Sequence, residues 1–215
     1  QEEQNDKRAM KTEMLITKSE ELAIKQVKKL IRKYRGSSVE ADLQLRLAEL
    51  YMRRAKSERF FELNRDSDTA AKLAPQRIKN ASSRRQIQQA VSIYDMIERR
   101  FKRFDKIDVV IFNNAFARQQ LGQVKTAERK YWKVIKSHNY SMLVPDCHLA
   151  IGEMAFRQNR YKDALAHFDA IKKYPQSRVY PYGLYKAGWS QYNLRNTLVA
   201  MKELEAVVNY GKMVE

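Results

Sequence analysis

Few residues of this chain have types and spacings that support catalysis or metal binding. Its three histidines, His138, His148 and His167, form neither an H-x3-H nor an H-E-x2-H pattern, the spacings that place two imidazoles on one helix face. Cys147 and His148 are adjacent, which on a helix turns their side chains about 100° apart and argues against a nucleophile–base pair. We therefore expect no enzyme activity, no bound metal and no cofactor.

The composition favours long helices joined by short connections. The 215 residues include 6 Gly and 4 Pro, too few for the turns of an all-β sandwich or barrel and too scattered for a phosphate-binding glycine loop. Hydrophobic residues make up 44% of the chain, enough for a folded core. The longest apolar run, residues 109–112, is far shorter than the roughly 20 residues that span a bilayer. The sequence predicts an all-α protein without a membrane span.

The net charge of +17 favours anionic partners or surfaces. The most concentrated basic residues, which define the predicted basic surface, are Arg84, Arg85, Arg99, Arg100, Lys102 and Arg103. Solvated faces of surface helices also explain such charges. Because no helix carries a recognised nucleic-acid reading motif, we do not expect nucleic acid as the main partner, and polyanion or nucleic-acid binding is the alternative function.

A pattern of one small and two larger residues recurs along the chain every 36 or 37 residues. Each copy reads Ala-x3-(aromatic or Leu)-x2-(Val or Ile), and the copies start at Ala90, Ala127, Ala164 and Ala200. A second small residue lies 12 positions before the last three of these alanines, at Ala115, Gly152 and Gly188. A period of this length predicts successive pairs of antiparallel helices.

This pattern resembles the tetratricopeptide repeat, a helix pair of about 34 residues whose small residues let the two helices pack closely. The steps of 36 and 37 are longer, and no Trp stands at the first signature position. The resemblance implies an α-solenoid with repeats at 37–103, 104–139, 140–176 and 177–215. Residues 1–36 would be helix B of an incomplete repeat, and about 30 extra residues form an insertion at about 64–85. We expect the last repeat to continue in a longer chain.

The resemblance also implies a concave groove lined by the first helix of each repeat, where such proteins bind peptides. Its positions fall on Phe112, Phe116, Gln119, Glu153, Phe156, Arg157, Tyr182, Tyr185, Trp189, Tyr192 and Asn193. Aromatic residues at helical spacing are also typical of a core, and that alternative stays open. The Lys and Asn with which chaperone-binding repeats hold a peptide carboxylate are absent, which argues against a C-terminal carboxylate as ligand.

Two stretches point to a particular group of repeat proteins. They are YPQSRVYPYGLYKAGW at 174–189 and RLAELYMRRA at 46–55. They resemble bacterial cell-envelope repeat proteins, including gliding-motility repeat proteins and, more distantly, Tol–Pal-associated and outer-membrane-assembly repeat proteins. This resemblance implies a scaffold that binds a protein or peptide partner in the periplasm or at the outer membrane; a cytoplasmic location is the alternative. The chain begins at Gln1, so we expect an upstream piece. An uncapped last repeat would also permit self-association.

Overall fold

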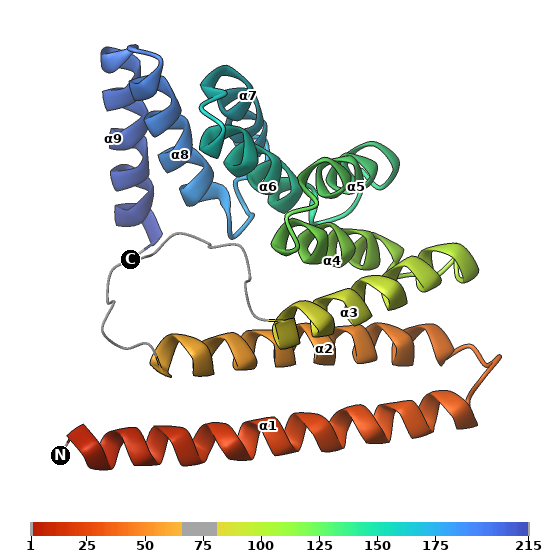
Figure 1. Ribbon diagram of the computed structural model, residues 1–215. Helices are drawn as coiled ribbons and strands as arrows, with labels where there is room; N and C mark the ends of the chain where they lie inside the picture. Colours follow the sequence, from red (N-terminus) through yellow and green to blue (C-terminus); the bar gives the residue numbers. More distant parts are fainter. Residues whose placement is uncertain (1, 66–80, 215) are drawn as a thin grey trace. The chain divides into compact units, whose positions relative to one another are not determined.

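The computed structural model describes residues 2–65 and 81–214, and within these ranges every regular element is an α-helix (Figure 1). Two compact units divide the chain, residues 1–123 and 124–215, and each is described by itself. The first holds α1 (Glu2–Lys33), α2 (Glu40–Arg65), α3 (Ala81–Arg100) and α4 (Ile107–Gln120). The second holds α5 (Val124–Ser137), α6 (Val144–Arg157), α7 (Tyr161–Ile171), α8 (Tyr180–Asn193) and α9 (Thr197–Val214). The all-α prediction is confirmed, and neighbouring helices pack in pairs.

The division between the units falls after Gln123, inside the segment 104–139 that the sequence predicts as one repeat. The predicted insertion at 64–85 lies for the most part outside the described residues, and its described ends belong to α2 and α3. No helix within the described ranges is long and apolar enough to cross a membrane.

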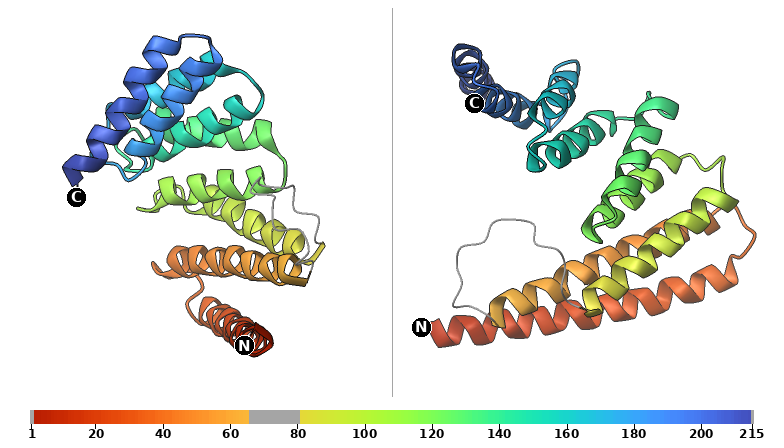
Figure 2. Two further views of the ribbon diagram at one scale, coloured as in Figure 1. Left: turned by 90° about the vertical axis from the view of Figure 1, so that its left-hand side faces the viewer. Right: turned by 45° about the horizontal axis from the view of Figure 1, so that its top comes forward.

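In the first unit, α1 and α2 lie side by side and α3 packs against α2, as two views show (Figures 1 and 2). The chain turns between α1 and α2 at Gly36, whose φ of 80° suits a residue without a Cβ. The Gly36 N–H donates to the carboxylate of Glu40 at 2.7 Å, and Arg100 at the end of α3 lies 3.2 Å from the same carboxylate. Glu40 is buried, so this carboxylate ties the α1–α2 turn to the end of α3.

The repeated residues of α3 form its buried face. Ala90, Tyr94 and Ile97 are all buried, as the pattern predicts. At the start of α3, the Ser83 hydroxyl donates to the backbone carbonyl of Ala55 in α2 at 3.0 Å. Ala48 of α2 is also fully buried.

A polar network with a buried amide at its centre joins α3 to α4. The amide of Asn114 donates to Asp95 at 2.7 Å and to Glu98 at 2.8 Å, while Arg118 lies 2.6 Å from the second oxygen of Asp95. Asn114 is fully buried, so losing either carboxylate would leave a buried donor unsatisfied. The network therefore fixes the rotation of α4 against α3.

Close contact between a glycine and a large side chain positions the helix pairs of the second unit. A Cβ on Gly152 of α6 would lie 2.6 Å from the ring of Phe168 in α7, and one on Gly188 of α8 would lie 2.9 Å from Leu204 in α9. Gly183 makes the same kind of approach to Ile171, between α7 and α8. Gly152 and Gly188 are small positions of the predicted pattern, Phe168 and Leu204 are its large positions, and the contacts explain their spacing. Gly183 is not part of the pattern.

The turn that follows the first helix of a pair also recurs. Gly122, Asn159 and Arg195 have φ values of 79°, 59° and 65°, at steps of 37 and 36 residues. In each case the next residue donates its N–H to the carbonyl five residues earlier, over 2.9 to 3.0 Å, which is the Schellman closure of a helix end. The sequence predicts this turn at Leu121–Gly122 alone, because Asn159 and Arg195 lack the glycine signal.

Gly152→Ala tests the close packing of α6 on α7. Since the added methyl would meet the buried ring of Phe168, we expect the free energy of unfolding in urea to fall by about 1–3 kcal/mol. Gly211→Ala in α9 is the matched control, because no atom lies within 4 Å of its added Cβ. That control should gain about 0.5–1 kcal/mol from helix propensity. Equal gains in both variants would contradict the packing.

Candidate functional site

Four aromatic side chains form a continuous row along α8. Tyr182, Tyr185, Trp189 and Tyr192 follow at spacings of three and four residues, which places them on one face of the helix. Adjacent ring centroids are 6.0, 6.2 and 5.7 Å apart, within the range of favourable aromatic pairs. All four remain 39–54% exposed, so each ring is braced by its neighbours yet presents a face to solvent.

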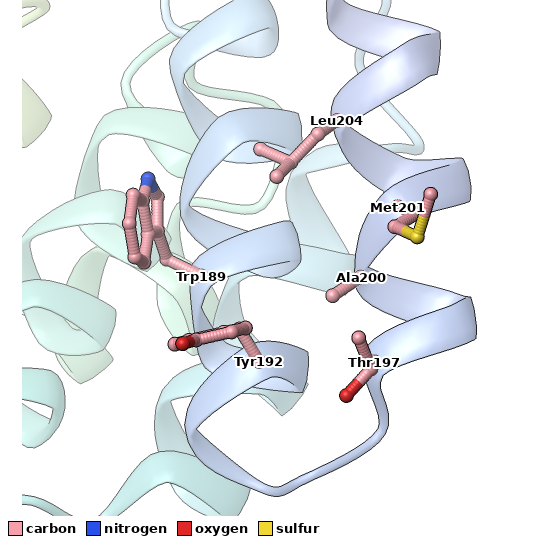
Figure 3. A pocket seen from close by; sticks show the side chains of 6 residues that line it. All are labelled: Trp189, Tyr192, Thr197, Ala200, Met201 and Leu204. Atoms are coloured by element: carbon pink, nitrogen blue, oxygen red, sulfur yellow. The ribbon is translucent and has the colours of Figure 1, made fainter.

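The end of this row borders an apolar pocket of about 380 Å³ between α8 and α9. Figure 3 shows its side chains, which are Trp189 and Tyr192 from α8 and Thr197, Ala200, Met201 and Leu204 from α9. Met201 is largely exposed, whereas Ala200 is buried. A pocket of this size and lining accepts an apolar side chain rather than a charged one.

Beside the row, the carboxylate of Glu153 in α6 contacts two side chains of α8. The Lys186 ammonium lies 3.0 Å from it, and the hydroxyl of Tyr182 donates to it at 3.4 Å. Burial and the negative charge of Glu153 raise the pKa of Tyr182, so its hydroxyl stays protonated. The Lys186 side chain is largely buried and its ammonium lies 3.8 Å from the centroid of the Phe156 ring. Glu153 and Lys186 thus hold the aromatic face of α8 against α6.

The other predicted groove residues of the second unit have different surroundings. Phe156 packs edge-on against Tyr161 and near Phe168, so it contributes to the core as well as to the surface, as the alternative reading allowed. Arg157 is exposed and lies 3.7 Å from Glu153. Asn193 donates to the backbone carbonyl of Trp189 at 2.8 Å and closes the exposed end of the row.

The remaining groove prediction falls on α4, in the first unit. Phe116 is exposed, whereas Phe112 and Gln119 are half-buried. These three residues belong to the first unit, so the candidate site on α6, α8 and α9 does not include them.

The predicted basic surface separates into two clusters within the first unit. Arg84 and Arg85 lie in the first turns of α3, and Arg99 and Arg100 lie in its last turn, with Lys102 and Arg103 directly after it. All six are exposed. The 14 residues from Arg85 to Arg99 correspond to about 21 Å of helix, so the six cations do not form one cluster.

Sequence reasoning missed a pair of histidines that meet between α6 and α7. Nδ1 of His148 lies 3.0 Å from Nδ1 of His167, so one neutral imidazole donates to the other. The Trp132 ring of α5 packs edge-on against both, with centroids 6.3 and 5.2 Å away. The two histidines lie on different helices, so their separation in the sequence matches no helical period that would indicate the contact. Within the described part of the chain, no three potential ligands gather into a metal site.

Their surroundings keep both rings neutral. Burial, followed by the charges of His167 and Lys173, lowers the pKa of His148 to about 4. Burial also lowers the pKa of His167, against the opposing effect of Glu128 and Asp163. Two protonated rings could not share the Nδ1 contact, so the contact between α6 and α7 depends on pH.

Lys186 was also left out of the predicted site, although the sequence around it indicates a specific role. It is the sole charged residue within the 14 residues of α8. A single charge in an otherwise aromatic and small-residue helix indicates a specific partner, which the structure identifies as Glu153. Its distance along the sequence from Glu153 gave no indication of that pairing.

The comparisons with known proteins add no relative to this picture. No family model matches the chain, and no curated protein matches it significantly. The class of the protein therefore rests on its own residues and contacts.

Lys186→Met tests whether the ammonium of Lys186 stabilises the partly buried carboxylate of Glu153. The variant leaves a partly buried carboxylate with weaker partners, so we expect a loss of about 1–3 kcal/mol in the free energy of unfolding. Adding Glu153→Gln should recover part of the loss, because the uncompensated charge is gone, and the double-mutant cycle should give a coupling of at least about 1 kcal/mol. Additive losses in urea denaturation would contradict the pairing.

The histidine pair predicts a loss of stability in mild acid. An unfolded His148 takes up a proton near its ordinary pKa of 6.5, whereas the folded one does so only near 4. The unfolded state therefore binds more protons between these values, and the free energy of unfolding falls as the pH drops from 6.5 towards 4. The full shift in pKa corresponds to roughly 3.4 kcal/mol, and because solvent screens the partly exposed ring we expect a contribution on the order of 2 kcal/mol.

His148→Phe should remove that contribution, while His138→Phe, outside the pair, should retain it. Urea denaturation at pH 7 and pH 4.5 measures both. An acid loss in His148→Phe as large as in the unaltered protein would show that other groups cause it.

Proposed function

We propose that this chain is a non-catalytic, tetratricopeptide-like repeat scaffold that binds a protein partner through the aromatic row of α8, in a bacterial cell-envelope complex. The recurring positions 90, 127, 164 and 200 support the repeat class. The resemblance of residues 174–189 to cell-envelope repeat proteins supports the periplasm or outer membrane as its location. The observation that carries the binding site is the exposed row from Tyr182 to Tyr192.

The row has the composition of an interaction surface. Tyr and Trp offer large contact areas with few rotatable bonds, which is why they dominate the energetic centres of protein interfaces. Contacts from ring to ring restrict the side chains of the row before a partner arrives. A partner therefore loses less binding free energy to side-chain ordering.

The pocket at the end of the row indicates the chemistry of the partner. Its apolar lining suits one anchoring side chain such as Leu, Met or Phe, while the phenolic hydroxyls of Tyr185 and Tyr192 are available for hydrogen bonds to a peptide backbone. We propose an extended or helical segment with an apolar anchor. The alternative of a polyanion-binding surface has weaker support, because the basic residues fall at opposite ends of α3.

A selection from a displayed library of random linear peptides on the immobilised full chain tests this function. The selected peptides should share one apolar anchor, and Tyr185→Ala/Trp189→Ala should weaken their binding at least about 30-fold, the loss of two aromatic contacts of about 1 kcal/mol or more each. Fluorescence polarisation of a labelled peptide measures this, and circular dichroism checks that helicity is intact.

Tyr140→Ala/Met142→Ala is the matched control, because it truncates two exposed large side chains outside the row. Its affinity should stay within about twofold of the unaltered protein. If the row variant binds the peptide as tightly as the unaltered protein, α8 is not part of the binding site. If the selection yields no peptide, that result argues against the proposed function.

A further inference from the structure

A second pocket, of about 640 Å³, lies in the first unit between the start of α2 and the end of α3. Its lining comes from Ser38, Ala41 and Asp42 on one side and from residues 99–105 on the other. The second side supplies four cations within five residues, Arg99, Arg100, Lys102 and Arg103. The volume falls in the range of small-molecule sites.

Two of the three acids near this pocket are already paired with cations. Glu40 is held by Arg100 at 3.2 Å and by the Gly36 N–H, and Asp42 is held by Lys106 at 2.6 Å. One oxygen of the third acid, Asp105, accepts the backbone N–H of Lys106 at 3.0 Å. The carboxylates of Glu40 and Asp42 therefore balance the charges of Arg100 and Lys106, and the single charge of Asp105 lowers but does not cancel the positive charge of the other three cations.

Three cations of the pocket have no carboxylate partner among the described residues. Lys102 and Arg103 make no ion pair or hydrogen bond there, and Arg99 donates only to the backbone carbonyl of Asp95, at 3.3 Å. All three are exposed, so their charges are available to a ligand. Two guanidinium groups and one ammonium offer the forked and single donors that phosphate oxygens accept.

The backbone holds these cations in place. Phe104 donates its N–H to the carbonyl of Phe101 at 2.9 Å, and Ile107 donates to Phe104 at 3.1 Å, which makes two consecutive closed turns. Lys102 and Arg103 are the two central residues of the first turn, the positions that project from it. Phe101 and Phe104 are half-buried on either side of them and also line the pocket. The Arg100 guanidinium lies 5.0 Å from the centroid of the Phe101 ring and is fixed there.

We propose that this pocket binds a phosphate-bearing small molecule. Arg99, Lys102 and Arg103 hold the phosphate oxygens, and an attached planar or apolar group lies against Phe101 and Phe104. The site is independent of the aromatic row on α8, because it is built from the first unit alone.

Isothermal titration of the full chain with inorganic pyrophosphate, adenosine diphosphate and adenosine tests the proposal. Pyrophosphate and the nucleotide should bind, the nucleotide more tightly, while adenosine alone should give no measurable heat. Lys102→Gln/Arg103→Gln should weaken the binding of both phosphate compounds at least about tenfold, since each lost charge-assisted contact removes a large share of the affinity.

Arg84→Gln/Arg85→Gln is the matched control, because it removes the same charge from exposed positions of α3 outside the pocket. Its affinity should change by no more than about twofold. An equal loss in both variants would show general attraction to a basic protein and would overturn the proposed site, as would the absence of pyrophosphate binding. A nucleotide that binds no more tightly than pyrophosphate would overturn the role of the two phenylalanines.

Discussion

The close approach of one helix to the next at a residue without a side chain is the constraint on which the second unit depends. Phe168 reaches the backbone of α6 because position 152 is Gly, and Leu204 reaches α8 because position 188 is Gly. A methyl group at either position would move a packed pair of helices apart. The aromatic row and the pocket beside it lie on α8 and α9, so their geometry follows from this packing.

The same packing determines which side of α8 faces outward. Gly183 and Gly188 turn one side of the helix towards α7 and α9, while Lys186 is drawn to Glu153 of α6. With its sole charged residue held in this way, the outer face of α8 consists of three tyrosines and a tryptophan. We therefore regard the Lys186–Glu153 pair as the support of the proposed binding surface rather than as part of its contact area.

Periodic features of the chain could be predicted from its sequence, and pairings between particular side chains could not. The alanine pattern placed Tyr94, Tyr131 and Phe168 in the core, where the structure has them, because core positions follow helical periodicity. The aromatic residues of α8 come instead from the groove positions that the repeat resemblance implies, and their spacing of three and four residues places them on one face of the helix. On α1, by contrast, the apolar side chains of Ile16 and Leu22 are exposed, since that helix packs mainly against α2.

The contacts that sequence reasoning missed join residues whose separation has no period. His148 and His167 are 19 residues apart, Lys186 and Glu153 are 33 apart, and Asn114 reaches back to Asp95 and Glu98. Each depends on the rotamers and on the rotation of two packed helices, which local spacing does not determine. The left-handed turns at Asn159 and Arg195 were missed for another reason: neither residue is a glycine, the residue type that marks this conformation most clearly.

Hydrogen–deuterium exchange of the full chain, with and without a selected peptide, tests the central claim most directly. The account predicts that the bound peptide slows exchange in α8 and in the first turns of α9, around residues 182–204, and leaves α1 unchanged. Protection confined to other helices, with α8 exchanging at its free rate, would contradict the assignment of the aromatic row as the partner site.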